Sequence, residues 1–296
     1  MSNILLTGGN GFVGKNIMDR VTKNLRTEEE LWFCPKSSEL DLANADDLLQ
    51  FVKMNRITKI VHTAVSTKFS GNPQMELFEN CRMLFALQKV APYVERILVM
   101  GSGAEYGKQR PINEAKESDF GKVVPESAYG LSKYLQNELC THSENIYNMR
   151  LFGVYGPYED WSSCFISNIC CKTIFNVPLS MRQNCIFSYI YVEDLVDIIL
   201  LFLRASHLNF KDYNIVSKEK IELRDIVSMI QNFEGTTLPL EIQKEGWNNE
   251  YSGCGDRFAN EFSHFFKSYQ EGIFRCYQWY QAHRNEIDVE LLRGTR

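Results

Sequence analysis

The stretch Thr7-Gly8-Gly9-Asn10-Gly11-Phe12-Val13-Gly14 directly follows the apolar run Ile4-Leu5-Leu6, which is typical of a buried strand. Gly8 allows a tight turn, Gly11 lets the backbone approach a ligand, and Gly14 lets the following helix pack against the strand. Free N–H groups at the start of that helix favour an anion. A glycine-rich turn without a ligand is the alternative. Directly after an N-terminal strand, however, the spacing favours a dinucleotide site, with candidate residues Gly8, Asn10, Gly11, Phe12, Val13 and Gly14.

Short apolar runs alternate with longer amphipathic segments through the first half of the chain. We expect strands at residues 4–6, 31–33, 59–64, 96–100 and 147–151, and helices at residues 11–25, 46–55, 73–90 and 127–142. Strands that alternate with helices of this length form βαβ units and a parallel sheet. The predicted fold class is therefore α/β, a Rossmann-like doubly wound parallel sheet with right-handed crossovers.

The pattern changes near Gly156, where prolines and glycines divide the chain into shorter pieces. We expect residues 1–155 to form the dinucleotide-binding domain. Residues 156–182 and 218–296 are expected to form a smaller C-terminal α/β lobe for the substrate. Strand-like runs at residues 189–192 and 213–216 predict that residues 183–217 return to the first domain.

Composition excludes several classes of protein. Of 296 residues, 32 are lysine or arginine and 37 are aspartate or glutamate, and the formal charge of −5 disfavours non-specific binding to nucleic acid. The nine cysteines include no Cys-x-x-Cys pair, and the first residues enter a strand directly, so we expect a cytoplasmic protein with reduced thiols. No apolar run is long enough for a membrane helix, and no histidine is spaced as a zinc site requires.

The residues after the second expected strand bear on the choice of cofactor. An acidic residue at this place binds the ribose 2′-hydroxyl of NAD and repels the 2′-phosphate of NADP. Here the sequence is Lys36-Ser37-Ser38, and the first acid is Glu39. A cation and two hydroxyls suit a phosphate, which predicts NADP(H) with Lys36 as a binding residue. A solvated loop lysine is the alternative.

Tyr129 and Lys133 are four residues apart in an expected helix and therefore share one face. A nearby ammonium favours the phenolate and lowers the pKa of a tyrosine, which suits an acid or base near neutral pH. Ser102 follows the fourth expected strand, at the edge where doubly wound sheets bind ligands. We predict Ser102, Tyr129 and Lys133 as catalytic residues. The alternative is that Tyr129 and Lys133 are residues of a helix surface and that Ser102 is a turn residue.

Taken in order, these motifs resemble the extended short-chain dehydrogenase/reductase family acting on nucleotide sugars. Beyond the glycine motif, the resemblance rests on Leu40-Asp41-Leu42, His62-Thr63-Ala64, Asn80, residues 102–107, 129–133 and 150–157, and Tyr189-Ile190-Tyr191-Val192-Glu193-Asp194. It implies that Asp41 and Leu42 meet the adenine and that Ala64 and Ser66 lie along the cofactor. It also implies that Lys133 binds the nicotinamide ribose, and that Ser102 and Tyr129 act on the substrate.

Within this family, residues 38–44 are most similar to GDP-fucose synthase and related reductases of 4-keto sugars. Sugar 4,6-dehydratases carry an Asp-Glu pair after the serine or threonine, where this chain has Gly103-Ala104, so dehydration is not expected. GDP-fucose synthase epimerises its substrate with a cysteine two positions after the serine and a later histidine. Ala104 and the lack of histidine between His142 and His207 predict that C3/C5 epimerisation is lost, unless Cys164 or another group has taken over.

The family often has an arginine before the Tyr-Ile-Tyr-Val segment, facing the nucleotide pyrophosphate. This chain has Phe187-Ser188 there, and Arg182 or Arg257 are the possible substitutes. The candidate substrate-binding residues are Ser102, Gly103, Arg182, Tyr189 and Arg257, and no metal is expected.

These observations predict an NADPH-dependent C4-ketoreductase of a nucleotide-activated 4-keto-6-deoxy sugar, GDP-linked by resemblance, without C3/C5 epimerase activity. A nucleotide-sugar C4 epimerase with tightly bound NAD is the first alternative, and a non-catalytic dinucleotide-binding regulator is the second. The apolar helices at 73–90 and 127–142 also predict a homodimer, because in the family these two helices pair across a twofold axis. Leu84 is the position that we expect to face the partner.

Overall fold

The computed structural model describes residues 2–23, 30–66 and 71–295. At its centre lies a sheet of six strands in the order β11-β6-β4-β3-β1-β2, in which every neighbouring pair is parallel. The chain passes from β1 to β2 and then returns to the other side of β1, which leaves a crevice at the carboxyl ends of β1 and β3. The strands are β1 (Ser2–Thr7), β2 (Glu30–Phe33), β3 (Lys59–His62), β4 (Arg96–Ser102), β6 (Ile146–Leu151) and β11 (Asp212–Asn214).

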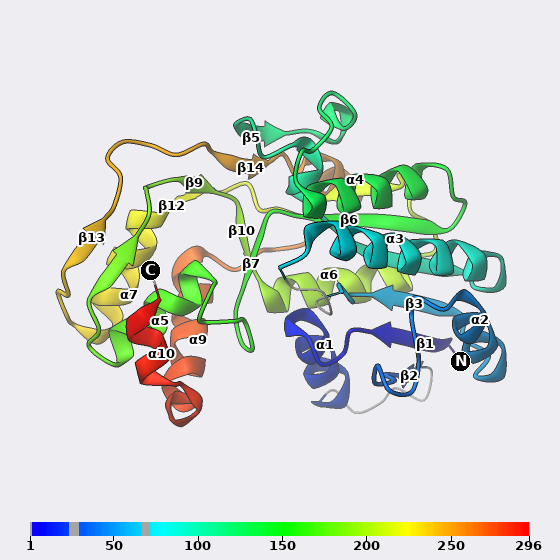
Figure 1. The fold of residues 1–296 in the computed structure, drawn as a ribbon, viewed down its shortest axis with the longest axis horizontal. Helices are drawn as coiled ribbons and strands as arrows, with labels where there is room; N and C mark the ends of the chain where they lie inside the picture. The colour runs from blue at the N-terminus through cyan, green and yellow to red at the C-terminus, as the bar shows by residue number, and fades with distance from the viewer. Residues whose placement is uncertain (1, 24–29, 67–70, 296) are drawn as a thin grey trace.

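Helices cover both faces of this sheet (Figure 1). One face carries α1 (Phe12–Lys23) and α6 (Val192–Arg204), and the other carries α2 (Ala45–Met54), α3 (Pro73–Val90) and α4 (Ala128–Thr141). Strand β1 serves both faces, because Ile4 and Leu6 pack in the core with α1 and α6, whereas Leu5 packs with α2 and α3. This arrangement confirms the predicted Rossmann-like, doubly wound α/β fold.

Two expected elements differ from the structure. The helix expected at residues 11–25 is described as far as Lys23, and residues 24 and 25 lie outside the described residues. The run at 189–192 forms β10 (Tyr189–Tyr191), which pairs with β7 (Gly153–Tyr155) and not with the main sheet. The run at 213–216 does contribute to the main sheet, through β11.

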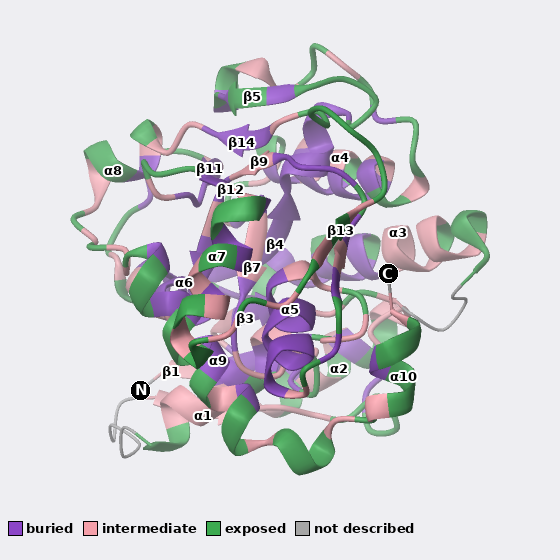
Figure 2. Cartoon of the chain, turned by 90° about the vertical axis from the view of Figure 1, so that its left-hand side faces the viewer, coloured by how far each residue is buried: buried purple, intermediate pink, exposed green. Residues whose placement is uncertain are grey.

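A second hydrophobic core lies beyond the main sheet and forms what we call the C-terminal lobe. Its helices are α5 (Phe165–Ile174), α7 (Leu223–Glu234), α9 (Tyr269–Ala282) and α10 (Val289–Gly294). Helix α5 is central, since every residue from Ile166 to Ile174 is buried, as Figure 2 shows. Beside it, β8 (Leu179–Met181) pairs in parallel with β13 (Leu240–Ile242).

A four-stranded sheet in the order β12-β9-β14-β5 joins the two parts. Strand β5 (Ile112–Ala115) follows β4 in the chain, whereas β9 (Ile186–Phe187), β12 (Ile221–Glu222) and β14 (Tyr251–Gly253) come from the second half. Tyr251 lies in register with Ile112 on one side and with Phe187 on the other. This pairing brings the Tyr251 side chain to the carboxyl end of β4.

Helices α3 and α4 expose large apolar side chains. Phe78 and Phe85 of α3 are 55% and 66% exposed, and Leu135 of α4 is 41% exposed. Phe78 and Phe85 are seven residues apart and therefore share one helix face. The expectation that Leu84 faces outward is wrong, because Leu84 lies on the inner side of α3 and is only 7% exposed.

Candidate active site

A cavity of about 650 Å³ lies at the carboxyl ends of β1 and β3. The predicted cofactor residues that line it are Gly8, Asn10, Gly11, Lys36, Asp41, Leu42, Ala64 and Ser66. Gly8 has a φ of +73°, and a Cβ atom there would lie 2.7 Å from the backbone nitrogen of Ala64. Both the backbone conformation and the lack of space require glycine. The glycine-rich turn is therefore built as a cradle open to a ligand, which fits a dinucleotide.

Phe12, Val13 and Gly14 begin helix α1 behind this turn. A Cβ atom at Gly14 would lie 2.3 Å from the carbonyl oxygen of Gly8, so only glycine lets the helix come this close. Val13 packs against the core of the main sheet. These residues place the N-terminus of α1 beside the cavity.

Lys36 and Ser37 line the cavity, whereas the carboxylate of Glu39 is bound to the backbone. The Lys36 N–H donates to Glu39 Oε2 over 2.7 Å, and the Glu39 N–H donates to the Lys36 carbonyl over 2.9 Å. Together these bonds close a turn. Arg82 of α3 also lines the cavity, where it is paired with Glu79 at 3.0 Å, and sequence analysis did not identify it.

Ser102 is the last residue of β4 and is 6% exposed. Its Oγ accepts a hydrogen bond from the Ala104 N–H over 3.2 Å, and its own N–H donates to Glu105 Oε1 over 2.9 Å. Both bonds start the short 3-10 helix Gly103–Tyr106. They fix the serine hydroxyl at the carboxyl edge of the sheet.

Helix α4 presents Tyr129 and Lys133 at the same edge. Ser127 caps the helix by accepting a hydrogen bond from the Gly130 N–H over 3.1 Å. The Tyr129 hydroxyl lies close enough to Ser102 for the serine side chain to lower the pKa of the phenol. Lys133 Nζ lies 6.0 Å from the centroid of the Tyr129 ring. The structure therefore brings all three predicted catalytic residues together.

Burial raises the pKa of Tyr129, the hydrogen bond with Ser102 opposes the rise, and the charge of Glu105 adds to it. Although 47% of the residue is exposed, the hydroxyl end is the part that is buried. The pKa of Tyr129 is thus raised overall and not lowered as expected, while the Lys133 ammonium donates to the Met100 carbonyl over 2.7 Å. Burial lowers the pKa of Lys133 to about 8. Near neutral pH, Tyr129 is therefore a protonated phenol beside a mostly charged lysine.

A buried network of charges supports Ser102. Glu105, which binds the Ser102 N–H, also accepts a hydrogen bond from Arg150 Nε over 2.7 Å. Arg150 Nη2 donates to Asp212 Oδ2 over 2.9 Å. Burial acts to lower the pKa of Arg150, but the neighbouring carboxylates raise it overall. Arg150 therefore stays charged, and the network holds the backbone of Ser102 in place.

Tyr251 joins the site from the second half of the chain. Its Oη lies 3.4 Å from Ser102 Oγ, and the residue is 5% exposed. Gly103, a predicted substrate residue, leaves room for it: a Cβ atom there would lie 2.5 Å from Phe152 Cδ1 and 2.8 Å from Tyr251 Oη. The phenol thus occupies the space where position 103 would otherwise carry a side chain.

Arg257, a predicted substrate residue, is paired with carboxylates of the chain, and its contact with substrate stays a prediction. Arg257, in α8 (Asp256–Glu261), is ion-paired with Asp212, and its Nε lies 3.8 Å from Glu117 Oε2. These carboxylates neutralise its charge and tie it to the same network as Arg150. It is therefore already committed to supporting the fold.

Arg182 and Tyr189 also lie away from Ser102. Arg182 is exposed directly after β8. The Tyr189 ring stacks on Phe187 with centroids 5.1 Å apart. Neither residue contacts Ser102 or Tyr129 in the described part of the chain, so their contact with substrate stays a prediction.

Cys164 is the N-cap residue of α5. Burial, together with the nearby Glu159, raises the pKa of Cys164 to about 12. Burial also raises the pKa of Glu159 to about 8, although the Ser167 hydroxyl donates a hydrogen bond to it. Both groups hold their protons at neutral pH, so neither is a ready base.

A smaller cavity of about 200 Å³ shares Tyr251 as part of its wall. Phe187 lines it, and Lys108 and Arg110 provide two exposed cations beside it. Lys108 Nζ lies 4.0 Å from the centroid of the Tyr251 ring. The cavity therefore offers positive charge beside the Tyr251 ring.

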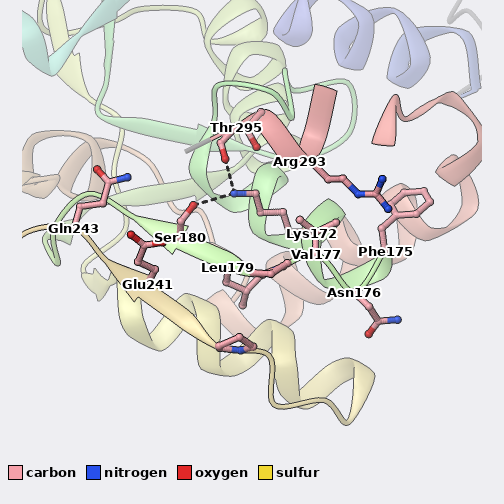
Figure 3. Close-up of a pocket in the computed structure, with 12 residues that line it drawn as sticks. Lys172, Phe175, Asn176, Val177, Leu179, Ser180, Glu241, Gln243, Arg293 and Thr295 are labelled. Carbon is pink, nitrogen blue, oxygen red and sulfur yellow. Dashed lines mark hydrogen bonds between the residues drawn. The ribbon is translucent and has the colours of Figure 1, made fainter. Parts of the chain in front are cut away.

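Figure 3 shows a separate cavity of about 810 Å³ in the C-terminal lobe. Lys172 Nζ donates to Ser180 Oγ over 2.9 Å and to the Thr295 carbonyl over 2.8 Å, drawn there as dashed lines. These two bonds hold the residues after α10 against β8. The cavity is bounded by elements other than those around Ser102.

Sequence analysis missed Glu105, Arg150 and Tyr251 as parts of this site. Glu105 and Arg150 occur in motifs that carry the family resemblance, but nothing in those motifs showed that both charges are buried. Tyr251 lies 149 residues after Ser102, and no local pattern marks it.

No group of three or more histidine, cysteine, aspartate or glutamate side chains could hold a metal ion in the described residues. None of the helices described combines the length and apolar character needed to cross a membrane.

Known proteins with similar sequences include enzymes that act on nucleotide sugars. The profile of the NAD dependent epimerase/dehydratase family matches residues 4–216. The chain is 25% identical to GDP-mannose 3,5-epimerase 1 from Oryza sativa subsp. indica over 275 residues, which cover 80% of this chain and 70% of that protein. It is 24% identical to GDP-L-colitose synthase from Yersinia pseudotuberculosis over 266 residues, with coverage of 79% and 83%.

One solved structure with a similar fold is a GDP-D-glycero-L-gluco-heptose synthase from Campylobacter jejuni, determined in the presence of NADPH. The two share a TM-score of 0.82 at 15% sequence identity, over 95% of this chain and 98% of the other. At this identity the likeness supports the fold.

Proposed function

The chain belongs to the NAD dependent epimerase/dehydratase family and is an NAD(P)-dependent oxidoreductase, and from that premise we propose that it reduces the C4 ketone of a nucleotide-activated 4-keto-6-deoxy sugar. The matched residues contain the glycine-rich turn, Ser102, Tyr129 and Lys133, so the resemblance to the extended short-chain dehydrogenases is confirmed. The relatives named for GDP-linked sugars favour a GDP-linked substrate.

The observation that carries this proposal is the meeting of three side chains at one edge of the sheet. Ser102 lies close enough to the Tyr129 hydroxyl to affect its pKa, and the Lys133 ammonium lies beside the tyrosine ring. They come from two elements, β4 and α4, that meet at the carboxyl edge of the sheet. The cavity at the glycine-rich turn opens at the same edge. A carbonyl held there would meet two hydroxyl groups at once.

When reduced nicotinamide dinucleotide is held at the glycine-rich turn, it would supply the hydride that the C4 carbonyl carbon accepts. Tyr129, which burial keeps protonated, gives its proton to the carbonyl oxygen, so the ketone becomes a hydroxyl. Ser102 donates a hydrogen bond to the same oxygen as negative charge develops on it. The Lys133 ammonium stabilises the phenolate that Tyr129 leaves behind.

NADPH is the proposed form of the cofactor. Lys36 and Ser37 line the cavity where a 2′-phosphate would lie, and they offer a cation and a hydroxyl. The carboxylate of Glu39, which would repel the phosphate, is held by the Lys36 N–H. Both features favour the phosphorylated dinucleotide.

Lys108 and Arg110 are the residues we assign to the diphosphate of the nucleotide sugar. They line the small cavity beside Tyr251, opposite Phe187, which stands where related enzymes often have an arginine. They replace Arg257, whose charge is neutralised by Asp212.

Reduction without C3/C5 epimerisation is part of the proposal. Epimerisation requires two groups that exchange protons with carbon near the working pH. Ala104, two positions after Ser102, is buried and has no such group. Cys164, with a pKa of about 12, and Glu159, with a pKa of about 8, are protonated at neutral pH. Neither is prepared to remove a proton.

A homodimer is also part of the proposal. Phe78 and Phe85 of α3 and Leu135 of α4 form an exposed apolar face on two adjacent helices. A second copy of the same face would cover these side chains across a twofold axis. The large exposed fraction of Phe85 makes it the best position for a test.

The test is a set of GDP-, UDP- and dTDP-linked 4-keto-6-deoxy sugars incubated with NADPH, following the absorbance of the reduced nicotinamide. The proposal expects one NADP⁺ released per sugar reduced, and a product with unchanged C3 and C5. An epimerase would convert sugar without net release of NADP⁺, and a regulator would convert none. Either result would overturn the proposal.

A further inference from the structure

Tyr251 is a buried phenol that the proposed reaction does not use. It comes from β14, and its ring is clamped by Phe152 and Phe187, with ring centroids 5.2 Å and 5.5 Å away. These two rings hold the Tyr251 side chain in place. In that position its hydroxyl points at Ser102 Oγ.

Ser102 Oγ lies between two phenols. It lies 3.4 Å from Tyr251 Oη and accepts the Ala104 N–H over 3.2 Å. On its other side it lies close enough to the Tyr129 hydroxyl to lower the pKa of that phenol. A hydroxyl has one proton to donate and two lone pairs to accept with. If one lone pair of Ser102 Oγ accepts the Ala104 N–H and the other accepts the Tyr251 hydroxyl, both acceptor positions are filled. The Ser102 proton is then available to donate to Tyr129 or to a substrate oxygen.

We propose that Tyr251 is a positioning residue that donates its hydrogen bond to Ser102 Oγ and so directs the Ser102 proton toward Tyr129 and the reacting oxygen. The catalytic role of Tyr251 rests on the proposed reductase function. The contact between the Tyr251 and Ser102 hydroxyls is independent of that function. Tyr251 keeps its proton throughout, so no atom or charge is added to the reaction.

The surroundings of Tyr251 suit a permanent donor. Burial raises its pKa, the Ser102 hydrogen bond opposes the rise, and the charges of Tyr129 and Glu105 add to it, so the phenol stays protonated. The other charged group that faces its ring is Lys108, 4.0 Å from the centroid. In a chain of hydrogen bonds each donor strengthens the next. Tyr251 therefore makes Ser102 a better donor.

The first experiment compares Tyr251→Phe with Tyr277→Phe. Both tyrosines are 5% exposed, but Tyr277 lies in the C-terminal lobe and its hydroxyl has no hydrogen-bond partner in the described part of the chain. Phenylalanine retains the ring contacts in each case. Tyr251→Phe should lower kcat roughly five- to tenfold with little change in KM, because one hydrogen bond to the reacting group is weakened. Tyr277→Phe should leave kcat unchanged.

A double-mutant cycle separates positioning from a structural role. In a Ser102→Ala background the Tyr251 hydroxyl has lost its acceptor, so Tyr251→Phe should cause little further loss of kcat. If Tyr251→Phe lowers kcat by the same factor with and without the Ser102 hydroxyl, the proposal is overturned. Tyr251→Phe keeps the ring that Phe152 and Phe187 contact, so the variant should fold.

A second readout needs no substrate. With tyrosine labelled with carbon-13 at Cζ, the Tyr129 resonance of the NADP⁺ complex is assigned by its loss in Tyr129→Phe and followed against pH. Weakening the Ser102 donor should raise the Tyr129 pKa in Tyr251→Phe by about half a unit or more, and leave it unchanged in Tyr277→Phe. An unchanged Tyr129 titration overturns the proposal, whereas failure to reduce any 4-keto sugar overturns only the proposed function.

Discussion

Arg150 Nε lies 2.7 Å from Glu105 Oε2, and neither side chain is exposed to solvent. This ion pair lies directly behind the serine, because the same carboxylate accepts the Ser102 N–H. Removing one partner of a buried pair leaves the other charge without compensation.

We therefore expect Glu105→Gln to lower the free energy of unfolding by about 3–5 kcal/mol, measured by chemical denaturation. Glu290→Gln is the control, because its pair with Arg293 lies on the surface, where such pairs contribute about 0–1 kcal/mol. Equal effects of the two substitutions would contradict the structural role of Glu105.

Tyr129→Phe removes the proton donor of the proposed reaction and leaves the ring in place. Turnover should fall by about 10²- to 10⁴-fold, while the dissociation constant for NADPH, measured by calorimetry, stays nearly unchanged. Tyr134→Phe, one turn further along α4, is the control, because the Tyr134 ring stacks on Phe120 away from Ser102. Activity retained by Tyr129→Phe would show that another group supplies the proton.

Lys36→Asp places a negative charge in the cavity where we assign the 2′-phosphate. The dissociation constant for NADPH should rise at least about tenfold, and that for NADH should fall or stay the same. Lys244→Asp makes the same change of charge at an exposed position in the second half of the chain. If the unchanged protein uses NADH as well as NADPH, the assignment of Lys36 is wrong.

Phe85→Glu should convert the proposed dimer into a monomer. A charge at a residue that is 66% exposed disturbs the folded chain little, but burying that charge between two copies is costly. Light scattering at micromolar concentration measures the mass. Phe265→Glu, at a residue that is 96% exposed, is the control and should leave the mass unchanged. A monomeric unchanged protein would refute the dimer.

The lowered pKa of the buried His62 side chain should make the stability of the protein depend on pH. Burial, with the Lys133 charge as a smaller cause, lowers the pKa of His62 to about 3 from an ordinary value of 6.5. Between these values the unfolded chain binds the proton and the folded chain does not, so stability decreases as pH falls below 6.5. The slope contributed by this one group is at most about 1.4 kcal/mol per pH unit.

The measurement is the free energy of unfolding between pH 4 and 7 for the unchanged protein and two variants. His62→Gln should have a shallower slope, because glutamine does not titrate and can still bond to Thr7, which His62 contacts over 2.8 Å. His142→Gln, at an exposed histidine, should leave the slope unchanged. Identical slopes for His62→Gln and the unchanged protein would refute the prediction.

Local patterns were enough to predict the main sheet. Strand β1, the glycine-rich turn and α1 follow one another directly, and the positive φ of Gly8 and the close approach of Gly14 to the Gly8 carbonyl involve residues near in sequence. The same holds for Tyr129 and Lys133, which a single helix places on one face. Such features can be recognised in the sequence because few residues determine them.

Features that depend on distant contacts were not predictable. Leu84 and Phe85 are adjacent and both apolar, and only the packing of α3 shows which one is buried. Arg257 looked available for a phosphate, but Asp212, 45 residues away, already binds it. Likewise, the direction of the Tyr129 pKa shift depends on burial, and composition or spacing does not reveal how deep a hydroxyl lies.

The space around Gly103 also limits how this enzyme can evolve. An aspartate at position 103, as in sugar dehydratases, would bring its Cβ atom within 2.5 Å of Phe152 and 2.8 Å of Tyr251 Oη. A lineage with this site therefore cannot gain a dehydratase-like acid by one replacement, since the aromatic residues must first become smaller. That first step would remove the phenol next to Ser102 before any new activity exists to compensate, so selection would oppose the path at its beginning.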